Sequence, residues 1–354
     1  MIYVAIFVVT IYLITLFAVK YKIKWPLVIA CTIMICISGL RHGYIDTRAY
    51  RNGFISLDIN KIFSLEYLKS EEKGKGFAIL GAIIKVFTEN SQAYLFILAL
   101  ITTAFMFWGI AKRVPNIELG IFLIITTGWF LDSMNGVRQC LVSAILFAFL
   151  PKYIENKKLL KYILIVLLMS TVHASALLFI PIYFIARVKP WSGKTWIILT
   201  VSTLFALFYN SGVGEFLADI LEGSEYGKDY GQMLIEGSTS VNVIRVAVAA
   251  VPLILSFVTK NNKNKYTPIY TIAFNMSLIN FVVWVFATKM LYFYRLVMYF
   301  TPYMILLICY EINELLNEKF RTIVYISAVA LFFVFHLYTA YTFGDILFVG
   351  YLKY

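Results

Sequence analysis

Long apolar runs, separated by short charged loops, are the feature that most constrains this chain of 354 residues. The run at 2–19 contains no charged residue, and similar runs recur along the rest of the sequence. A helix needs about 20 apolar residues to cross a bilayer, whereas a barrel strand needs only about 10. Hydrocarbon offers no water to backbone groups, so only helices and closed barrels cross it, and these runs are too long for barrel strands. The sequence therefore predicts an all-α polytopic membrane protein.

The charged fraction supports this class. Only 14% of the residues are charged and 61% are hydrophobic, whereas about 25% of the residues in a soluble domain are charged. We expect a single integral membrane domain over 1–354 with about twelve transmembrane helices. The predicted spans are 2–19, 26–40, 93–111, 117–131, 138–151, 158–172, 174–187, 195–210, 243–259, 267–288, 291–310 and 322–343.

The distribution of Lys and Arg predicts the orientation of these spans. A basic cluster at 20–24 follows the first apolar run, and later loops such as 152–161 and 260–265 are again basic. With the N-terminus outside, these loops face the cytoplasm and carry the whole formal net charge of +12, in agreement with the positive-inside rule. We therefore predict extracytoplasmic N- and C-termini, and we attribute the basic balance to topology and not to nucleic-acid binding.

One apolar stretch does not fit the count of spans. Residues 77–87 are apolar but too short to cross the bilayer, and they include Lys85. Counting them as a span would reverse every later helix, so we predict a short re-entrant or interfacial helix on the outer face. It lies in the first of two larger extracytoplasmic segments, 41–92. The second, 211–242, is acidic and rich in glycine, and we expect it to form an outer lid.

The usual motifs of soluble enzymes are absent, because the sequence has no Walker loop, dinucleotide fingerprint, HExxH or GxSxG. Basic and titratable residues gather instead at the predicted outer ends of spans, where the positive-inside rule predicts few. The first group follows the second span and includes Arg41, Asp46 and Arg48. Such a dense group indicates a binding site; the alternative is that Arg41 is an interfacial anchor or pairs with Asp46.

Two further candidates lie at predicted helix ends. Arg138 falls in the first turn of a helix, where a cation opposes the positive end of the helix dipole. A bound anion would remove this conflict, and so would an ion pair with Asp132. His173 lies between two short apolar runs, at the tip of a predicted helical hairpin. There it is either a general base or a hydrogen-bonded structural residue.

The last candidates lie near the outer ends of later spans. Arg295 is about one turn inside its span and needs either a carboxylate or a phosphate as partner; Arg245 is a weaker candidate of the same kind. His336 lies mid-span among aromatic residues and is expected to be structural. Guanidinium groups bind phosphate oxygens in bidentate fashion. The shared depth of these residues therefore indicates an anionic ligand, a diphosphate above all, presented from the outer leaflet.

The chain resembles the EpsG family of exopolysaccharide and capsule polymerases, which are Wzy-like membrane proteins. The resemblance extends from the second predicted helix to at least the eleventh, and its motifs occur in the family's order. The residues that carry it are Arg41 with the pattern Asp46-Thr47…Tyr50, the run 135–139 (NGVRQ) and the run 173–177 (HASAL).

The resemblance implies a polymerase of the bacterial cytoplasmic membrane with a GT-C-like fold. It would join undecaprenyl-diphosphate-linked oligosaccharides at the outer face, in exopolysaccharide, capsule or O-antigen synthesis, beside a flippase and a chain-length regulator. Under this reading His173, Asp46 and Arg138 are catalytic, with His173 or Asp46 as the base, and neither a metal nor a cofactor is needed. The expected diphosphate ligands are Arg41, Arg48, Arg138, Arg245 and Arg295.

Two other functions compete with polymerisation. A flippase or exporter of lipid-linked oligosaccharides needs polar groups along a route through the bilayer, whereas the charges here collect at the outer boundary. A membrane O-acyltransferase that modifies surface glycans needs a histidine reachable from the cytoplasm, whereas His42 and His173 both map outward. The polymerase therefore fits the pattern best.

Overall fold

The computed structural model describes residues 2–70, 72–208, 241–260, 266–290, 293–315 and 318–342. Within these ranges the chain forms helices and turns and contains no strand. Its contacts divide it into two compact units, Met1–Tyr183 with Ile312–Tyr354 and Phe184–Glu311. We call these unit 1 and unit 2 and describe each by itself.

The predicted all-α polytopic fold is confirmed. In the described ranges, 6 helices are long and apolar enough to cross a membrane, and α8 with α9 forms a further candidate, bent by 53°. The other apolar runs of the sequence correspond to shorter helices, so each predicted span has a helical counterpart. The long helices are α1 (Ile2–Tyr21), α7 (Ser91–Arg113), α10 (Val137–Glu155), α17 (Pro268–Ala287), α18 (Tyr294–Tyr310) and α19 (Glu318–Thr342); the bent pair is α8 (Ile117–Thr126) and α9 (Trp129–Asn135); the shorter elements are α2 (Trp25–Gly39), α11 (Leu159–Val172), η1 (Ala174–Leu178) with α12 (Phe179–Ile185), α13 (Gly193–Phe208) and α16 (Val243–Val258).

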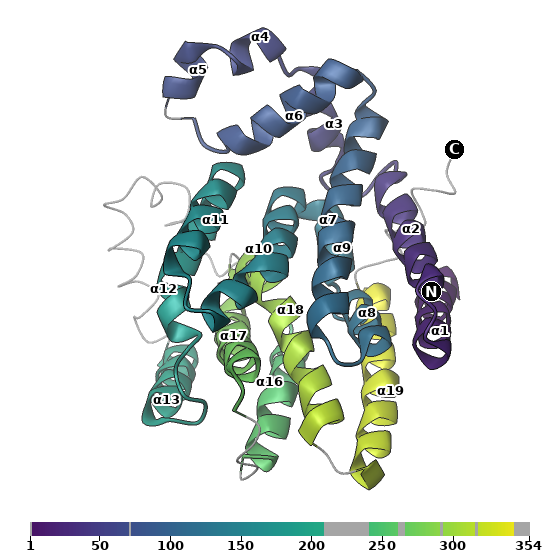
Figure 1. Ribbon diagram of the computed structural model, residues 1–354, viewed down its shortest axis with the longest axis vertical. Coiled ribbons are helices and arrows are strands. Elements are labelled where there is room, and N and C mark those ends of the chain that lie inside the picture. Colours follow the sequence, from purple (N-terminus) through teal and green to yellow (C-terminus); the bar gives the residue numbers. More distant parts are fainter. Residues whose placement is uncertain are drawn as a thin grey trace. The chain divides into compact units, whose positions relative to one another are not determined.

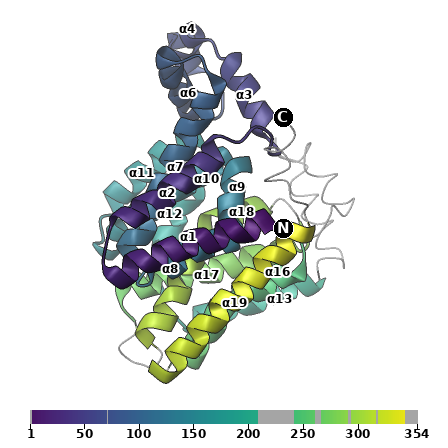
Figure 2. The ribbon, with the colours of Figure 1, turned by 90° about the vertical axis from the view of Figure 1, so that its right-hand side faces the viewer.

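Unit 1 is built around α7 and α10. Helix α7 packs on α2 and α10, α10 also packs on α11, and α19 returns along α8 and α1 (Figures 1 and 2). The side chain of Glu118 in α8 is only 5% exposed. It accepts a hydrogen bond from the Tyr325 hydroxyl of α19 (3.2 Å), which lies 3.1 Å from the Tyr12 hydroxyl of α1. A polar contact therefore joins three apolar helices.

Four short helices form a cap on one end of unit 1. They are α3 (Thr47–Ile55), α4 (Ile59–Ile62), α5 (Leu65–Lys69) and α6 (Lys75–Phe87). Helix α6 has 13 residues and runs across the ends of α7 and α11, not alongside them (Figure 1). The interfacial position of this helix, in the predicted segment 41–92, stays a prediction.

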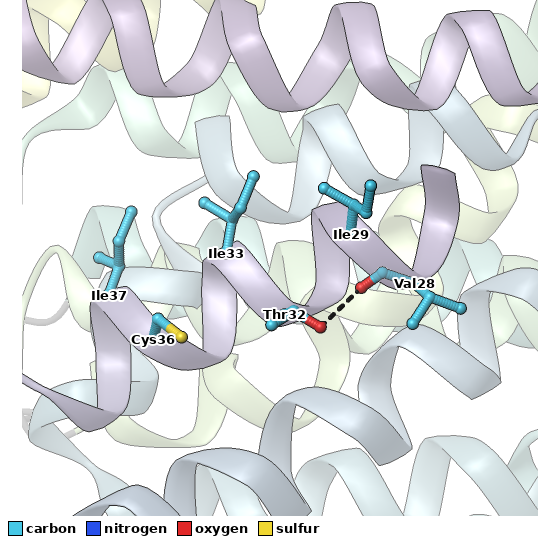
Figure 3. A pocket seen from close by; sticks show the side chains of 6 residues that line it. All are labelled: Val28, Ile29, Thr32, Ile33, Cys36 and Ile37. Carbon is cyan, nitrogen blue, oxygen red and sulfur yellow. Dashed lines mark hydrogen bonds between the residues drawn. The ribbon is translucent and has the colours of Figure 1, made fainter. Parts of the chain in front are cut away.

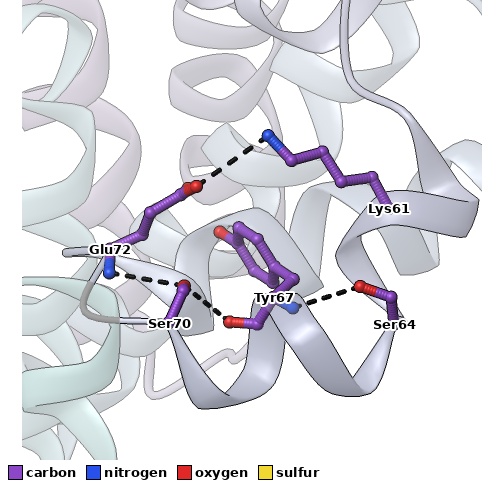
Figure 4. Close-up of polar contacts among 5 residues, drawn as sticks. All are labelled: Lys61, Ser64, Tyr67, Ser70 and Glu72. Atoms are coloured by element: carbon purple, nitrogen blue, oxygen red, sulfur yellow. Dashed lines mark hydrogen bonds and ion pairs between the residues drawn. The ribbon is translucent and has the colours of Figure 1, made fainter.

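Local polar contacts fix the turns of the cap (Figure 4). Ser64 precedes α5, and its hydroxyl accepts the backbone N–H of Tyr67 (3.1 Å), as an N-cap does. At the other end, the Ser70 hydroxyl donates to the Tyr67 carbonyl (2.7 Å). Lys61 and Glu72 form an ion pair of 3.8 Å across the cap. The path of the chain through these short helices is therefore specified by neighbouring residues.

Unit 2 packs α17 against α13, α16 and α18. Where α18 ends, Glu311 is completely buried. Its carboxylate accepts hydrogen bonds from the Tyr270 hydroxyl (2.6 Å) and the Thr259 hydroxyl (2.7 Å). Ser256 lies 2.5 Å from the Tyr270 oxygen and accepts the Trp191 indole N–H (3.0 Å). A buried carboxylate is tolerated only with such partners, so this network joins α16, α17 and α18.

We expect the Glu311 network to stabilise unit 2. Replacing Tyr270 by Phe removes a hydrogen bond to a buried carboxylate and should cost about 1–3 kcal/mol. The measurement is the Tm of the purified protein in detergent. Tyr341→Phe is the control, because Tyr341 is 75% exposed on α19. Equal Tm values for the two variants would contradict this assignment.

Candidate functional site

The candidate site of unit 1 is centred on Arg138. Helix α9 ends at Asn135 and α10 begins at Val137, so a single residue, Gly136, connects them. The side chain of Val137 is buried, whereas that of Arg138 is exposed in the first turn of α10. In the described part of the chain, Arg138 forms no ion pair with Asp132 or another carboxylate. Its guanidinium lies over the ring of Phe77, 4.9 Å from the centroid.

Phe77 belongs to an aromatic cluster beneath Arg138. Its ring lies edge-on to Tyr50 (6.1 Å between centroids) and to Tyr94 (6.4 Å). Tyr94 in turn stacks on Phe54 at 4.3 Å. Tyr50 comes from α3, Phe77 from α6 and Tyr94 from α7. The cluster therefore joins the cap to the spans at the first turn of α10.

Two glycines at the start of α6 lie beside Arg138 and the end of α11. Gly74 has φ +78°, and a Cβ on it would lie 3.4 Å from Nη1 of Arg138 and 3.8 Å from the carbonyl oxygen of Val172. A Cβ on Gly76 would lie 2.2 Å from the Thr171 hydroxyl oxygen and 2.9 Å from its carbonyl carbon. The start of α6 is thus packed against the end of α11, the helix that leads into His173.

His173 occupies the junction after α11. It ends α11 and begins η1, and its ring is half-buried. Its Nδ1 lies 2.7 Å from the Ser175 hydroxyl and accepts the Ser175 backbone N–H (3.4 Å). The predicted turn between two short apolar helices is therefore present. Because Gly74 neighbours both Val172 and Arg138, the structure brings the His173 junction and Arg138 to the same end of unit 1.

Arg41 is buried between α2 and the cap, with 3% of its surface exposed. Its Nε donates to the Thr47 hydroxyl (3.1 Å), and its Nη1 donates to the Ser38 carbonyl (2.5 Å). The Arg41 carbonyl accepts a hydrogen bond from Arg51 (3.1 Å), which also donates to Gln92 of α7. Arg41 therefore helps to hold α3 on the end of α2, and its role as a diphosphate ligand stays a prediction.

The neighbours of Arg41 approach the second motif. Burial raises the pKa of Tyr44. The negative charge of Asp132 raises this pKa further, whereas the positive charge of Arg41 lowers it. Asp46 and Arg48 are exposed at the start of α3. The motifs around 41–50 and 132–138 thus meet in space, as the hypothesis of a shared site requires.

The remaining predicted arginines belong to unit 2. Arg245, in the first turn of α16, lies over the rings of Trp284 (5.4 Å) and Tyr294 (5.8 Å). Arg295 is exposed in the first turn of α18, next to Tyr294. The Val241 N–H donates to the Ala287 carbonyl (3.4 Å), so α16 begins where α17 ends. That these arginines join Arg138 in one pocket stays a prediction.

Sequence reasoning missed several parts of this site. It treated 77–87 only as a short apolar helix and did not assign Phe77, Gly74 or Gly76 to the surroundings of Arg138. The available signal was the alternation of glycine and lysine directly before Phe77 (KGKGF, 73–77).

Most of the predicted outer lid, residues 211–240, lies outside the described residues. His336 is buried at 1% exposure in α19.

An apolar groove of about 320 Å³ lies along α2 (Figure 3). Its one hydroxyl, that of Thr32, donates to the Val28 carbonyl (2.9 Å). The surface therefore presents no unsatisfied hydroxyl to lipid. The lining residues are Val28, Ile29, Thr32, Ile33, Cys36 and Ile37.

These observations define a multi-pass α-helical membrane protein with a basic and aromatic site at one end of unit 1. The predicted family is also confirmed, because the EpsG family model matches residues 24–354. The chain belongs to the EpsG family. No curated protein and no solved structure matches it. Family membership indicates a role in polysaccharide biosynthesis similar to that of a polysaccharide polymerase.

The close approach at Gly76 should be essential to the site. Gly76→Ala places a methyl group against the backbone of Thr171, so α6 must shift, at a cost of about 1–3 kcal/mol for overpacking. We expect a lower Tm and shorter polysaccharide. Gly53→Ala in α3 is the matched control, because a Cβ there meets nothing within 4 Å. A Gly76→Ala protein with the Tm and product length of the control would show that the contact is unimportant.

Proposed function

We propose that this protein joins lipid-diphosphate-linked oligosaccharide repeat units into a polysaccharide at the outer face of the bacterial cytoplasmic membrane. Membership of the EpsG family supports this reaction class. The observation that carries the proposal is the exposed guanidinium of Arg138, at a helix N-terminus and near the His173 junction. An anion fits both the cation and the positive end of the helix.

In the proposed step, the acceptor hydroxyl oxygen attacks the anomeric carbon of the growing chain. A new glycosidic C–O bond forms, and the C–O bond to the lipid diphosphate breaks. The bonding electrons leave with the diphosphate, whose growing negative charge Arg138 neutralises. The hydroxyl proton passes to a base, and the lipid diphosphate is released.

His173 is the first candidate for the base, and Asp46 is the second. Ser175 contacts His173 at Nδ1, and the His173 imidazole is the group to which we assign proton transfer. Asp46 is exposed at the start of α3 and lies in the same motif region as Arg41. A general base contributes typically about 10²–10⁴ in rate, enough to distinguish the two by kinetics.

The proposed substrate also needs sites for its lipid and its second phosphate. Arg41, Arg48, Arg245 and Arg295 are the proposed further diphosphate ligands. The groove on α2 offers an apolar surface for part of the undecaprenyl chain. The positive-inside pattern supports an outward-facing site, and a flippase that supplies the repeat unit and a chain-length regulator are the proposed protein partners.

Arg138→Ala should abolish long-chain product while leaving the protein in the membrane. Loss of one charge-stabilising donor typically costs about 10²–10³ in kcat, and Arg138→Lys should recover only part of it because Lys cannot bind bidentately. The assay uses purified protein in nanodiscs with lipid-diphosphate oligosaccharide and resolves product length by gel. Lys69→Ala, at an exposed position of α5, is the control.

A normal length distribution from Arg138→Ala would overturn the assignment of this residue. Translocation of the lipid-linked oligosaccharide by the native protein without elongation would replace the polymerase with a flippase. Elongation by the native protein and the Lys69→Ala control, but not by Arg138→Ala, is the supporting result.

His173→Gln should lower kcat by about 10²–10⁴ if His173 accepts the hydroxyl proton. The KM for the lipid-linked donor should change little, because the base acts in the chemical step. Asp46→Asn is measured in parallel under the same conditions. A large fall in kcat for Asp46→Asn, with none for His173→Gln, would transfer the role of base to Asp46.

A further inference from the structure

Helix α6 holds an aromatic ring against the proposed catalytic cation. Phe77 is 7% exposed, and the guanidinium of Arg138 lies 4.9 Å from its centroid. Tyr50 and Tyr94 meet the same ring edge-on. The ring is therefore fixed from below by packing, while the cation above it is exposed.

An aromatic partner differs chemically from a carboxylate partner. A carboxylate would neutralise Arg138 and occupy some of its five N–H donors. A ring attracts the cation through its π face and leaves these donors for another acceptor. Phe77 can therefore restrain the guanidinium without competing with an anionic ligand.

Arg138 also lies close to Tyr50 of the same cluster. Burial raises the pKa of Tyr50, whereas the charge and the backbone N–H of Arg138 oppose that effect. Tyr50 belongs to α3 and Phe77 to α6. Both cap helices thus act on one residue at the start of α10.

We propose that Phe77 is a positioning residue that holds the Arg138 guanidinium toward the diphosphate of the substrate, and that α6 serves to carry this ring. The proposal rests on the proposed function, because it assigns Arg138 the role described above. It explains why a helix too short to cross the membrane is packed so closely on α11 through Gly76.

The test compares Phe77→Leu, which keeps an apolar side chain but removes the ring, with Phe77→Tyr, which keeps the ring. Loss of the cation–π contact should reduce kcat/KM for the lipid-diphosphate donor roughly 5- to 30-fold. Phe77→Tyr should restore most of it. Phe147→Leu is the matched control: Phe147 is completely buried in α10, but the cation over its ring is Arg113, not Arg138. It should lower Tm without changing kcat/KM.

A double-mutant cycle separates positioning from general loss of packing. In an Arg138→Lys background, Phe77→Leu should reduce kcat/KM by clearly less than in the native background, because the two residues act through one contact. If Phe77→Leu is poorly folded, the same cycle is measured with Phe77→Met. Equal fold-losses in the two backgrounds would overturn the proposal.

The outcomes also distinguish this proposal from the function on which it rests. Normal polymerisation by Arg138→Ala would refute the function of Arg138, and the positioning role would fall with it. An inactive Arg138→Ala together with a fully active Phe77→Leu would refute only the positioning role. Loss in Phe77→Leu, recovery in Phe77→Tyr and an unchanged kcat/KM in Phe147→Leu support both.

Discussion

The absence of water in hydrocarbon is the constraint on which this structure depends. It makes each apolar run helical, because only a helix satisfies its own backbone groups. It also makes each buried polar side chain costly unless partners are present. Glu311 follows this rule, because the Tyr270 and Thr259 hydroxyls donate to its carboxylate. The Tyr325 hydroxyl donates to one oxygen of the Glu118 carboxylate, so a polar contact also joins α8 and α19.

The cost of a charged side chain without a partner also applies to Arg138. Its guanidinium is exposed, rests on the ring of Phe77 and, within the described ranges, has no carboxylate partner. Arg41 differs, since the Ser38 carbonyl and the Thr47 hydroxyl hold it in the joint between α2 and the cap. Two arginines that look alike in the sequence therefore lie in different surroundings: Arg41 is buried in the joint between α2 and the cap, and Arg138 is exposed and lies over an aromatic ring.

Much of the fold could be predicted from the sequence, because the length and polarity of each run report directly on the bilayer. The helices that match the predicted spans show this, as does the short helix at 75–87. The motif residues Arg41, Arg138 and His173, whose roles stay predictions, were singled out from the sequence because cations and imidazoles are rare in apolar surroundings. Phe77 was not, because one phenylalanine among the 30 in this chain carries no signal of its contact with a cation.

The sequence by itself determined the class of protein and the family. Hydrophobic periodicity and residue chemistry are properties of neighbouring positions, so they can be read along the chain. Only the tertiary structure shows that Arg41 is buried and that Arg138 lies over an aromatic ring. It alone also shows that Gly76 lets α6 approach α11. Those outcomes depend on side chains far apart in sequence meeting within a few ångströms, and no local pattern encodes such a distance.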